Sequence, residues 1–147
     1  MTHETRDPAN GRFRAEQRFA RSFDALDGIF AFVDRAFELL ALDRAHLHDV
    51  RVAIEELFTN MVKYAPDGAP EVSVALAVAG DELTVTLTDF DVEPFDIRTS
   101  PAPPLQGPAS ERQPGGLGIH LVRQLMDGIG YHYEDRTSTT TLTKRLR

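Results

Sequence analysis

The chain has 147 residues, of which 41% are hydrophobic and 27% charged, as in a single globular domain with its own core. Its formal net charge of -7 argues against general binding to a nucleic-acid backbone, although a local site for one nucleotide is compatible with it. The absence of cysteine excludes disulfides and thiolate metal sites. No apolar run is long enough to span a membrane and no signal-peptide pattern is visible, so we expect a cytoplasmic protein.

The first half of the chain predicts a strand followed by two helices. Residues 1–10 are polar and predict a flexible tail, whereas residues 12–20 alternate weakly, as in a strand. Apolar residues spaced by three and four then predict an amphipathic helix with Asp24 as its N-cap. Asp43 predicts the start of a second helix, which runs to about Ala65, where a Pro-Asp-Gly sequence stops it.

A hairpin and a long loop follow. Residues 71–79 and 82–89 alternate between apolar and polar side chains, and the glycine and aspartate between them predict a turn. Residues 92–114 show no period and contain six of the nine prolines. A loop of this length in a small domain is usually functional or disordered.

The last third predicts a helix within residues 115–127 and two closing strands at 129–135 and 139–146. Residues 11–147 are therefore expected to form one domain. The order of elements predicts an α+β fold, a two-layer sandwich in which helices cover one face of a mostly antiparallel sheet.

Two polar residues of the second helix, Glu56 and Asn60, lie one turn apart and outside its apolar stripe. A solvated helix face would explain this pair. However, asparagine disfavours helix interiors, and its carboxamide oxygen is a suitable ligand for Mg²⁺. A carboxylate one turn earlier could accept a proton during phosphoryl transfer. The pair is therefore compatible with a solvated face and with a site.

Asp89 continues the parity of the apolar residues Leu83, Val85 and Leu87. If the strand includes Asp89, the carboxylate points into the core and needs a partner, such as the exocyclic amine of adenine. If the strand ends at Thr88, Asp89 simply begins the loop.

Three glycines, Gly115, Gly116 and Gly118, precede the last apolar helix. Free backbone N–H groups at a helix N-terminus form an anion site, although glycines also merely end loops. The pattern is neither a Walker A loop nor G-x-G-x-x-G. Its position after a long proline-rich loop is typical of a lid that closes over phosphates.

Taken together, the segments EELFTN, DFDVEPFD and GGLGIHLV resemble, in this order, the motifs of the GHKL ATPase superfamily, and within it the anti-sigma factor serine kinases. The resemblance implies a histidine kinase-like ATPase fold that binds ATP and Mg²⁺, with residues 92–114 as the ATP lid. It implies that Glu56 is the catalytic base and that Asn60 binds the metal. It further implies that the nucleotide is bound by Asn60, Asp89, Asp91, Arg112, Gly115, Gly116 and Gly118.

The resemblance also implies a reaction and partners. The γ-phosphate of ATP would be transferred to a serine of a STAS-type anti-anti-sigma factor, and the same protein would bind a sigma factor and so regulate transcription. The resemblance implies no direct contact with nucleic acid or membrane. It does imply a homodimer formed through the sheet.

One motif departs from the family pattern, in which a glycine stands two residues after the strand-end aspartate. Here Asp91 takes that position, and Pro94 lies one residue too far along. If Pro94 sets the register instead, Phe90 takes the place expected for Asp89. Asp tolerates a positive φ better than most residues, so nucleotide binding remains compatible with this sequence. The alternative is a non-enzymatic partner-binding module with the same fold and a degenerate nucleotide site.

Overall fold

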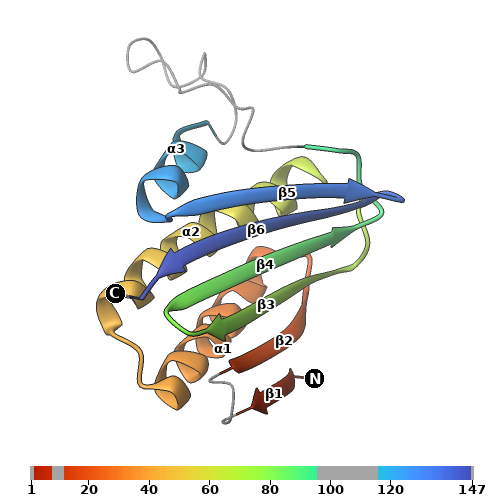
Figure 1. Ribbon diagram of the computed structural model, residues 1–147. Coiled ribbons are helices and arrows are strands. Elements are labelled where there is room, and N and C mark those ends of the chain that lie inside the picture. Colours follow the sequence, from red (N-terminus) through yellow and green to blue (C-terminus); the bar gives the residue numbers. More distant parts are fainter. Residues whose placement is uncertain (1, 8–11, 96–115, 147) are drawn as a thin grey trace.

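The computed structural model describes residues 2–7, 12–95 and 116–146. Within them, six strands form one antiparallel sheet in the order β1-β2-β3-β4-β6-β5, and three α-helices pack against one of its faces (Figure 1). The predicted α+β fold with two layers is therefore confirmed. The elements, in chain order, are β1 (Thr2–Asp7), β2 (Arg12–Ala20), the 3-10 turn η1 (Phe23–Ala25), α1 (Leu26–Leu40), α2 (Arg44–Tyr64), β3 (Glu71–Ala79), β4 (Glu82–Phe90), α3 (Gly116–Leu125), β5 (Gly128–Glu134) and β6 (Thr137–Arg145).

The core lies between the sheet and the helices. Every second residue of β4 is buried against the helical layer, and Leu83, Val85 and Leu87 are fully buried. The apolar stripe of α2 contributes Ile54 and Phe58, which are also fully buried. The strand period of two and the helix period of 3.6 thus direct the apolar side chains of both layers into one core.

Of the two helix starts predicted from the sequence, the structure confirms the one at Asp43 and not the one at Asp24. The carboxylate of Asp43 accepts the Ala45 N–H at 2.9 Å, so this residue is the N-cap of α2 as expected. The prediction of Asp24 as an N-cap is wrong. Instead, the hydroxyl of Ser22 accepts the Asp24 N–H at 3.2 Å and caps η1, and α1 begins only at Leu26.

The N-terminal strand β1 corrects a second expectation. Residues Thr2–Asp7 form an edge strand that pairs with β2, from Thr2 opposite Gln17 to Asp7 opposite Arg12. The polar sequence predicted a flexible tail over residues 1–10. The segment has no apolar alternation because it only extends the backbone ladder of β2, and its side chains from Thr2 to Thr5 are exposed.

Lys144 joins the end of α3 to the rest of the domain. Its Nζ donates to the Leu125 carbonyl oxygen at 2.6 Å and to Asp49 Oδ2 at 2.9 Å. The lysine side chain is 14% exposed and that of Asp49 is 26% exposed. A cation close to the last carbonyls of a helix also interacts favourably with the helix dipole. This contact holds α3 beside α2, where the candidate site lies.

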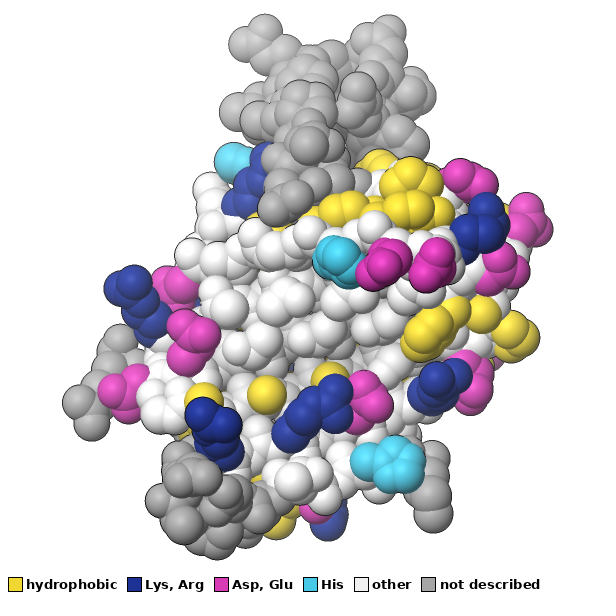
Figure 2. Space-filling view, turned by 45° about the vertical axis from the view of Figure 1, so that its right-hand side comes forward, with side chains coloured by type: hydrophobic (Ala, Val, Ile, Leu, Met, Phe, Trp, Pro, Cys, Tyr) yellow, Lys and Arg dark blue, Asp and Glu magenta, His cyan; other side chains and the backbone are white. Residues whose placement is uncertain are grey.

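The other face of the sheet is uncharged over its central strands (Figure 2). Figure 2 shows this face as a broad area without charged side chains, with lysine, arginine, aspartate and glutamate around its margin. Small and hydroxyl side chains stand opposite one another across the strands, as in the row Ala75, Thr86 and Thr141. In the part of the chain that the structure describes, no helix is both long and apolar enough to cross a membrane.

Candidate functional site

A cavity of about 460 Å³ lies at the end of the sheet where β4 stops. Its volume is within the range of small-molecule and cofactor sites. The walls come from the last turns of α2, the α2–β3 loop, the end of β4 with the residues after it, and β6. The lining residues are Leu57, Asn60, Met61, Tyr64, Ala65, Pro66, Asp67, Gly68, Asp89, Asp91, Val92, Glu93, Pro94, Phe95, Arg136, Ser138 and Thr140.

Asp89 lies inside β4 and points into this cavity. The strand runs to Phe90, and Asp89 is only 4% exposed, opposite Val72 on β3 and Ser138 on β6. Of the two readings left open by the sequence, the inward carboxylate is therefore the observed one. Phe90 faces the opposite side of the sheet, where the guanidinium of Arg18 lies 4.8 Å from its ring centroid. It does not take the place of Asp89.

The partner of Asp89 is Arg21, which the sequence analysis did not identify. The two side chains form a bidentate ion pair, and each is 5% exposed. A signal for this pair exists in the sequence. Arg21 continues the inward parity of Phe13, Ala15 and Phe19, as Asp89 continues that of its own strand. Since β2 and β4 both pair antiparallel with β3, their last residues lie at the same end of the sheet.

Asn60 lines the same cavity from α2. Its Nδ2 atom is buried and has no hydrogen-bond partner among the described residues. The oxygen and nitrogen of a carboxamide can exchange places by a half-turn of the group, which would present the oxygen to the same space. A carboxamide with a free position, one helical turn from the carboxylate of Glu56, fits the few protein ligands that Mg²⁺ takes beside phosphates.

Glu56 lies against α3 rather than in the lining of the cavity. It is half-buried, and a Cβ atom added to Gly118 would overlap its Oε2 atom and lie 2.8 Å from its Cδ atom. The glycine therefore leaves the space that the carboxylate fills. Gly116 is the first residue of α3, whereas Arg112 and Gly115 lie outside the described residues. Glu56 and Asn60 are both half-buried, so this flank of α2 is not a solvated helix face.

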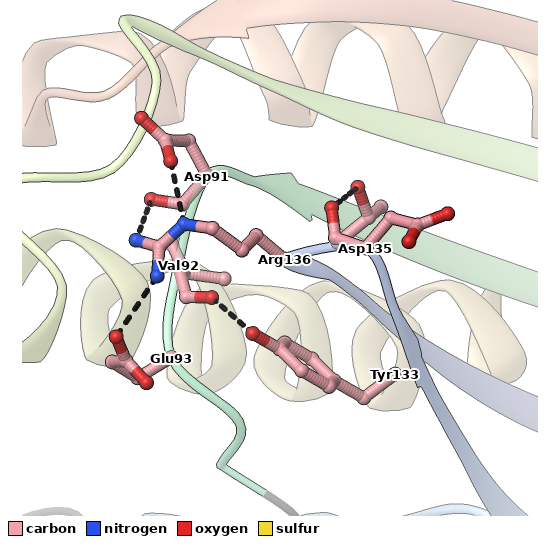
Figure 3. A network of polar contacts seen from close by, with 7 residues as sticks. Asp91, Val92, Glu93, Tyr133, Asp135 and Arg136 are labelled. Atoms are coloured by element: carbon pink, nitrogen blue, oxygen red, sulfur yellow. Dashed lines mark hydrogen bonds and ion pairs between the residues drawn. The ribbon is translucent and has the colours of Figure 1, made fainter.

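The segment after β4 is fastened to the β5–β6 hairpin. Asp91 has a left-handed backbone, with φ of 56°, as expected for a residue in a glycine position. Its carboxylate accepts a hydrogen bond from Arg136 Nε at 2.8 Å, and the Glu93 carboxylate accepts one from Arg136 Nη1 at 2.9 Å (Figure 3). The Tyr133 hydroxyl donates to the Val92 carbonyl oxygen at 2.7 Å.

The hydrogen bond to Asp91, and to a smaller extent that to Glu93, raises the pKa of the Arg136 guanidinium above its ordinary value. Arg136 thus lines the cavity as part of an ion-pair cluster with the two carboxylates of Asp91 and Glu93. Of the predicted lid at residues 92–114, only residues 92–95 are described, and this fastening holds its first residues in place.

The close approach of Gly118 to Glu56 predicts that a substitution at Gly118 moves the Glu56 carboxylate without lowering the stability of the protein. We expect Gly118→Ala to keep or slightly raise the free energy of unfolding, because alanine favours a helix by about 0.5–1 kcal/mol over glycine. The Glu56 carboxylate must nevertheless leave its position. Thermal unfolding and a crystal structure of the variant measure the two effects. Gly130→Ala is the control, since its new Cβ would meet its nearest neighbours, atoms of Thr141, at ordinary contact distances. An unmoved Glu56 would contradict this account.

The backbone of Asp91 leads to a second prediction. Asp91→Ala and Asp91→Gly both remove the carboxylate, so their comparison isolates the left-handed backbone. We expect the alanine variant to be less stable by about 1 kcal/mol, because a Cβ atom is disfavoured at positive φ. Urea unfolding of both proteins measures the difference. An alanine variant as stable as the glycine variant would show that φ at this position is not constrained.

Comparisons with known proteins agree with this architecture. Residues 19–144 match the histidine kinase-like ATPase domain. The serine-protein kinase RsbW of Listeria monocytogenes serovar 1/2a is 30% identical in an alignment of 113 residues that covers 68% of this chain and 66% of that protein. RsbW of Halalkalibacterium halodurans is 28% identical over 105 residues, covering 69% and 64% respectively. The chain thus spans slightly less than two thirds of the length of these relatives.

Two solved structures share the fold. The RsbU and RsbW domains of a Mycobacterium tuberculosis protein superpose with a TM-score of 0.61 at 20% identity, covering 89% of this chain and 32% of that one. The SiaB–SiaC complex of Pseudomonas aeruginosa gives a TM-score of 0.60 at 15% identity, covering 88% and 86%. The domain match extends over most of the chain, including all three helices and five of the six strands at least in part. The chain therefore belongs to the histidine kinase-like ATPase domain family.

Proposed function

We propose that this chain is an ATP-dependent serine kinase that phosphorylates a STAS-type anti-anti-sigma factor and also binds a sigma factor. The observation that carries the proposal is the grouping of Asn60 and Asp89 in one cavity, with Glu56 one helical turn away against Gly118. Relatives named serine-protein kinase RsbW support the same reaction. ATP and sigma factors are both cytoplasmic, so the proposal places the protein in the cytoplasm.

In this proposal, one end of the site binds the base of ATP and the other end binds its phosphates. Asp89 lines the inner end of the cavity and would accept a hydrogen bond from the exocyclic amine of adenine. Asn60 would hold Mg²⁺, whose contribution when bound is to neutralise charge on the phosphates. Backbone N–H groups in the first turn of α3, at Gly116 and Gly118, would face the phosphates. Arg112, Gly115 and the lid at residues 92–114 remain predictions for the same end.

Glu56 would act as the general base. Its carboxylate takes the proton of the partner's serine hydroxyl as the serine oxygen bonds to the γ-phosphorus. The bond between that phosphorus and the oxygen bridging to the β-phosphate breaks, and ADP leaves. The proton on Glu56 then returns to solvent. Most of the rate enhancement in such a reaction comes from positioning and charge, which agrees with a site of few side chains.

A non-enzymatic module that binds regulatory partners is the second candidate. Two observations favour it: the Asp89 carboxylate is already paired with Arg21, and Asp91 stands where the family has glycine. The two candidates differ in their need for a bound nucleotide and for the carboxylate of Glu56.

The test uses Glu56→Gln, which keeps the shape of the side chain and removes its basicity. We expect phosphoryl transfer from ATP to a purified STAS-domain protein of the same organism to fall by about 100- to 10,000-fold, the usual contribution of a general base. Transfer is measured with radiolabelled ATP and Mg²⁺ over a panel of such STAS proteins.

Nucleotide binding by the same variant is the control. ATP with Mg²⁺ at about 100 times its Kd adds ~2.7 kcal/mol of stability, which corresponds to about 5–10 °C in Tm for a chain of this size. The shift should be similar in the wild type and in Glu56→Gln. A wild-type protein that shows no shift, yet binds a STAS partner tightly, would favour the non-enzymatic module.

We also propose that two copies associate through the open face of the sheet. The central strands present uncharged residues on this face, so two negatively charged chains can meet there with little repulsion (Figure 2). Depletion of charge at the centre is typical of interfaces, and a two-fold axis brings the same patch together from both copies.

Thr86→Arg tests this association. Thr86 lies in the middle of the face between Ala75 and Thr141, and a longer side chain there extends into solvent in a single chain. We expect the wild type to sediment with the mass of two chains and the variant with that of one. Thr5→Arg, on the exposed edge strand β1, is the control and should keep the wild-type mass. A wild-type protein that remains a single chain at high concentration would refute the proposal.

A further inference from the structure

The guanidinium of Arg21 donates four hydrogen bonds in the interior of the domain. Its Nε donates to the Ala69 carbonyl oxygen at 2.8 Å, and Nη1 to the Met61 carbonyl oxygen at 3.3 Å. Nη1 also donates to Asp89 Oδ2 at 3.4 Å, and Nη2 to Oδ1. The backbone N–H of Arg21 donates to the Pro70 carbonyl oxygen at 2.8 Å. One residue thus binds the end of α2, the α2–β3 loop and the end of β4.

The Arg21 side chain bonds both oxygens of the Asp89 carboxylate, yet only Asp89 of the two lines the cavity. Gly68 makes room for this arrangement, because a Cβ atom there would overlap Nη2 of Arg21 and lie 2.8 Å from Val92 Cγ1. A planar fork that bonds both oxygens fixes the plane of a carboxylate, which a single ammonium donor cannot do. Each oxygen of Asp89 keeps a lone pair for a donor inside the cavity.

We infer that Arg21 is a positioning residue for base recognition, which orients the Asp89 carboxylate so that the cavity selects a purine carrying an exocyclic amine. The inference rests on the proposed function, since it concerns the base of the nucleotide in that site. Arg21 acts only through Asp89 and the loop that it holds, and it makes no contact with the ligand.

The experiment compares two nucleotides that differ in one group. ATP carries the exocyclic amine, and purine riboside triphosphate has a hydrogen in its place. The ratio of their Kd values, measured by titration calorimetry with Mg²⁺, reports the amine contact alone, because both ligands share the sugar and the triphosphate. For the wild type we expect ATP to bind about 10- to 100-fold more tightly, the usual value for a hydrogen bond to a charged group.

Arg21→Lys keeps the positive charge and removes the fork. We expect the ratio to fall to within about threefold of unity, while the Kd of purine riboside triphosphate changes little. A purely structural role would weaken both ligands together and leave the ratio unchanged. Arg18→Lys is the matched control, since Arg18 lies on the same strand but on the opposite face of the sheet, over Phe90. It should keep the wild-type ratio.

Gly68→Ala provides an independent variant if Arg21→Lys does not fold. It leaves the charge of Arg21 in place and displaces Nη2, so it should also lower the ratio. A wild-type ratio in either folded variant overturns the inference. A wild type that binds ATP without preferring it also overturns the inference but leaves the kinase proposal intact. A wild type that binds neither nucleotide overturns both.

Discussion

The ion pair between Arg21 and Asp89 is the interaction on which the inner end of the cavity depends. Two side chains that are each 5% exposed lose most of their hydration, a cost that their mutual attraction offsets only when the remaining donors and acceptors are also bonded. On the arginine side of the pair, the carbonyl oxygens of Met61 and Ala69 accept two further hydrogen bonds. Segments separated by up to 68 residues in the chain are therefore held in one arrangement.

The opposite end of the site depends on close approach of two helices. α2 carries Glu56 and Asn60 on a flank that is half-buried, and α3 comes near enough to this flank only because Gly118 has no side chain. Lys144 secures the end of α3 to Asp49 on the same helix α2. The position of the carboxylate thus follows from helix packing, whereas the position of Asp89 follows from the sheet.

Elements with a strong period could be predicted from the sequence, and those without one could not. The N-cap at Asp43 and the inward parity that ends in Asp89 both follow from local patterns, and both are observed. β1 has no such pattern, because an exposed edge strand needs only backbone pairing. Arg21 was missed because its role depends on which strand ends are neighbours, and that is fixed by the order of strands in the sheet.

The segment after β4 shows how a motif can change its residues and retain its geometry. Asp91 stands where the motif expected from the sequence has a glycine, and it adopts a left-handed φ of 56°, which a glycine would also permit. Unlike glycine, it also brings a carboxylate, and this carboxylate bonds Arg136 on the neighbouring hairpin. The extra residue before Pro94 lies in the same fastened stretch, between the Val92 contact with Tyr133 and the Phe95 N–H, which donates to the Tyr131 hydroxyl at 2.9 Å. Side-chain bonds to the β5–β6 hairpin therefore hold the backbone of this segment in a turn with a left-handed residue although no glycine stands there.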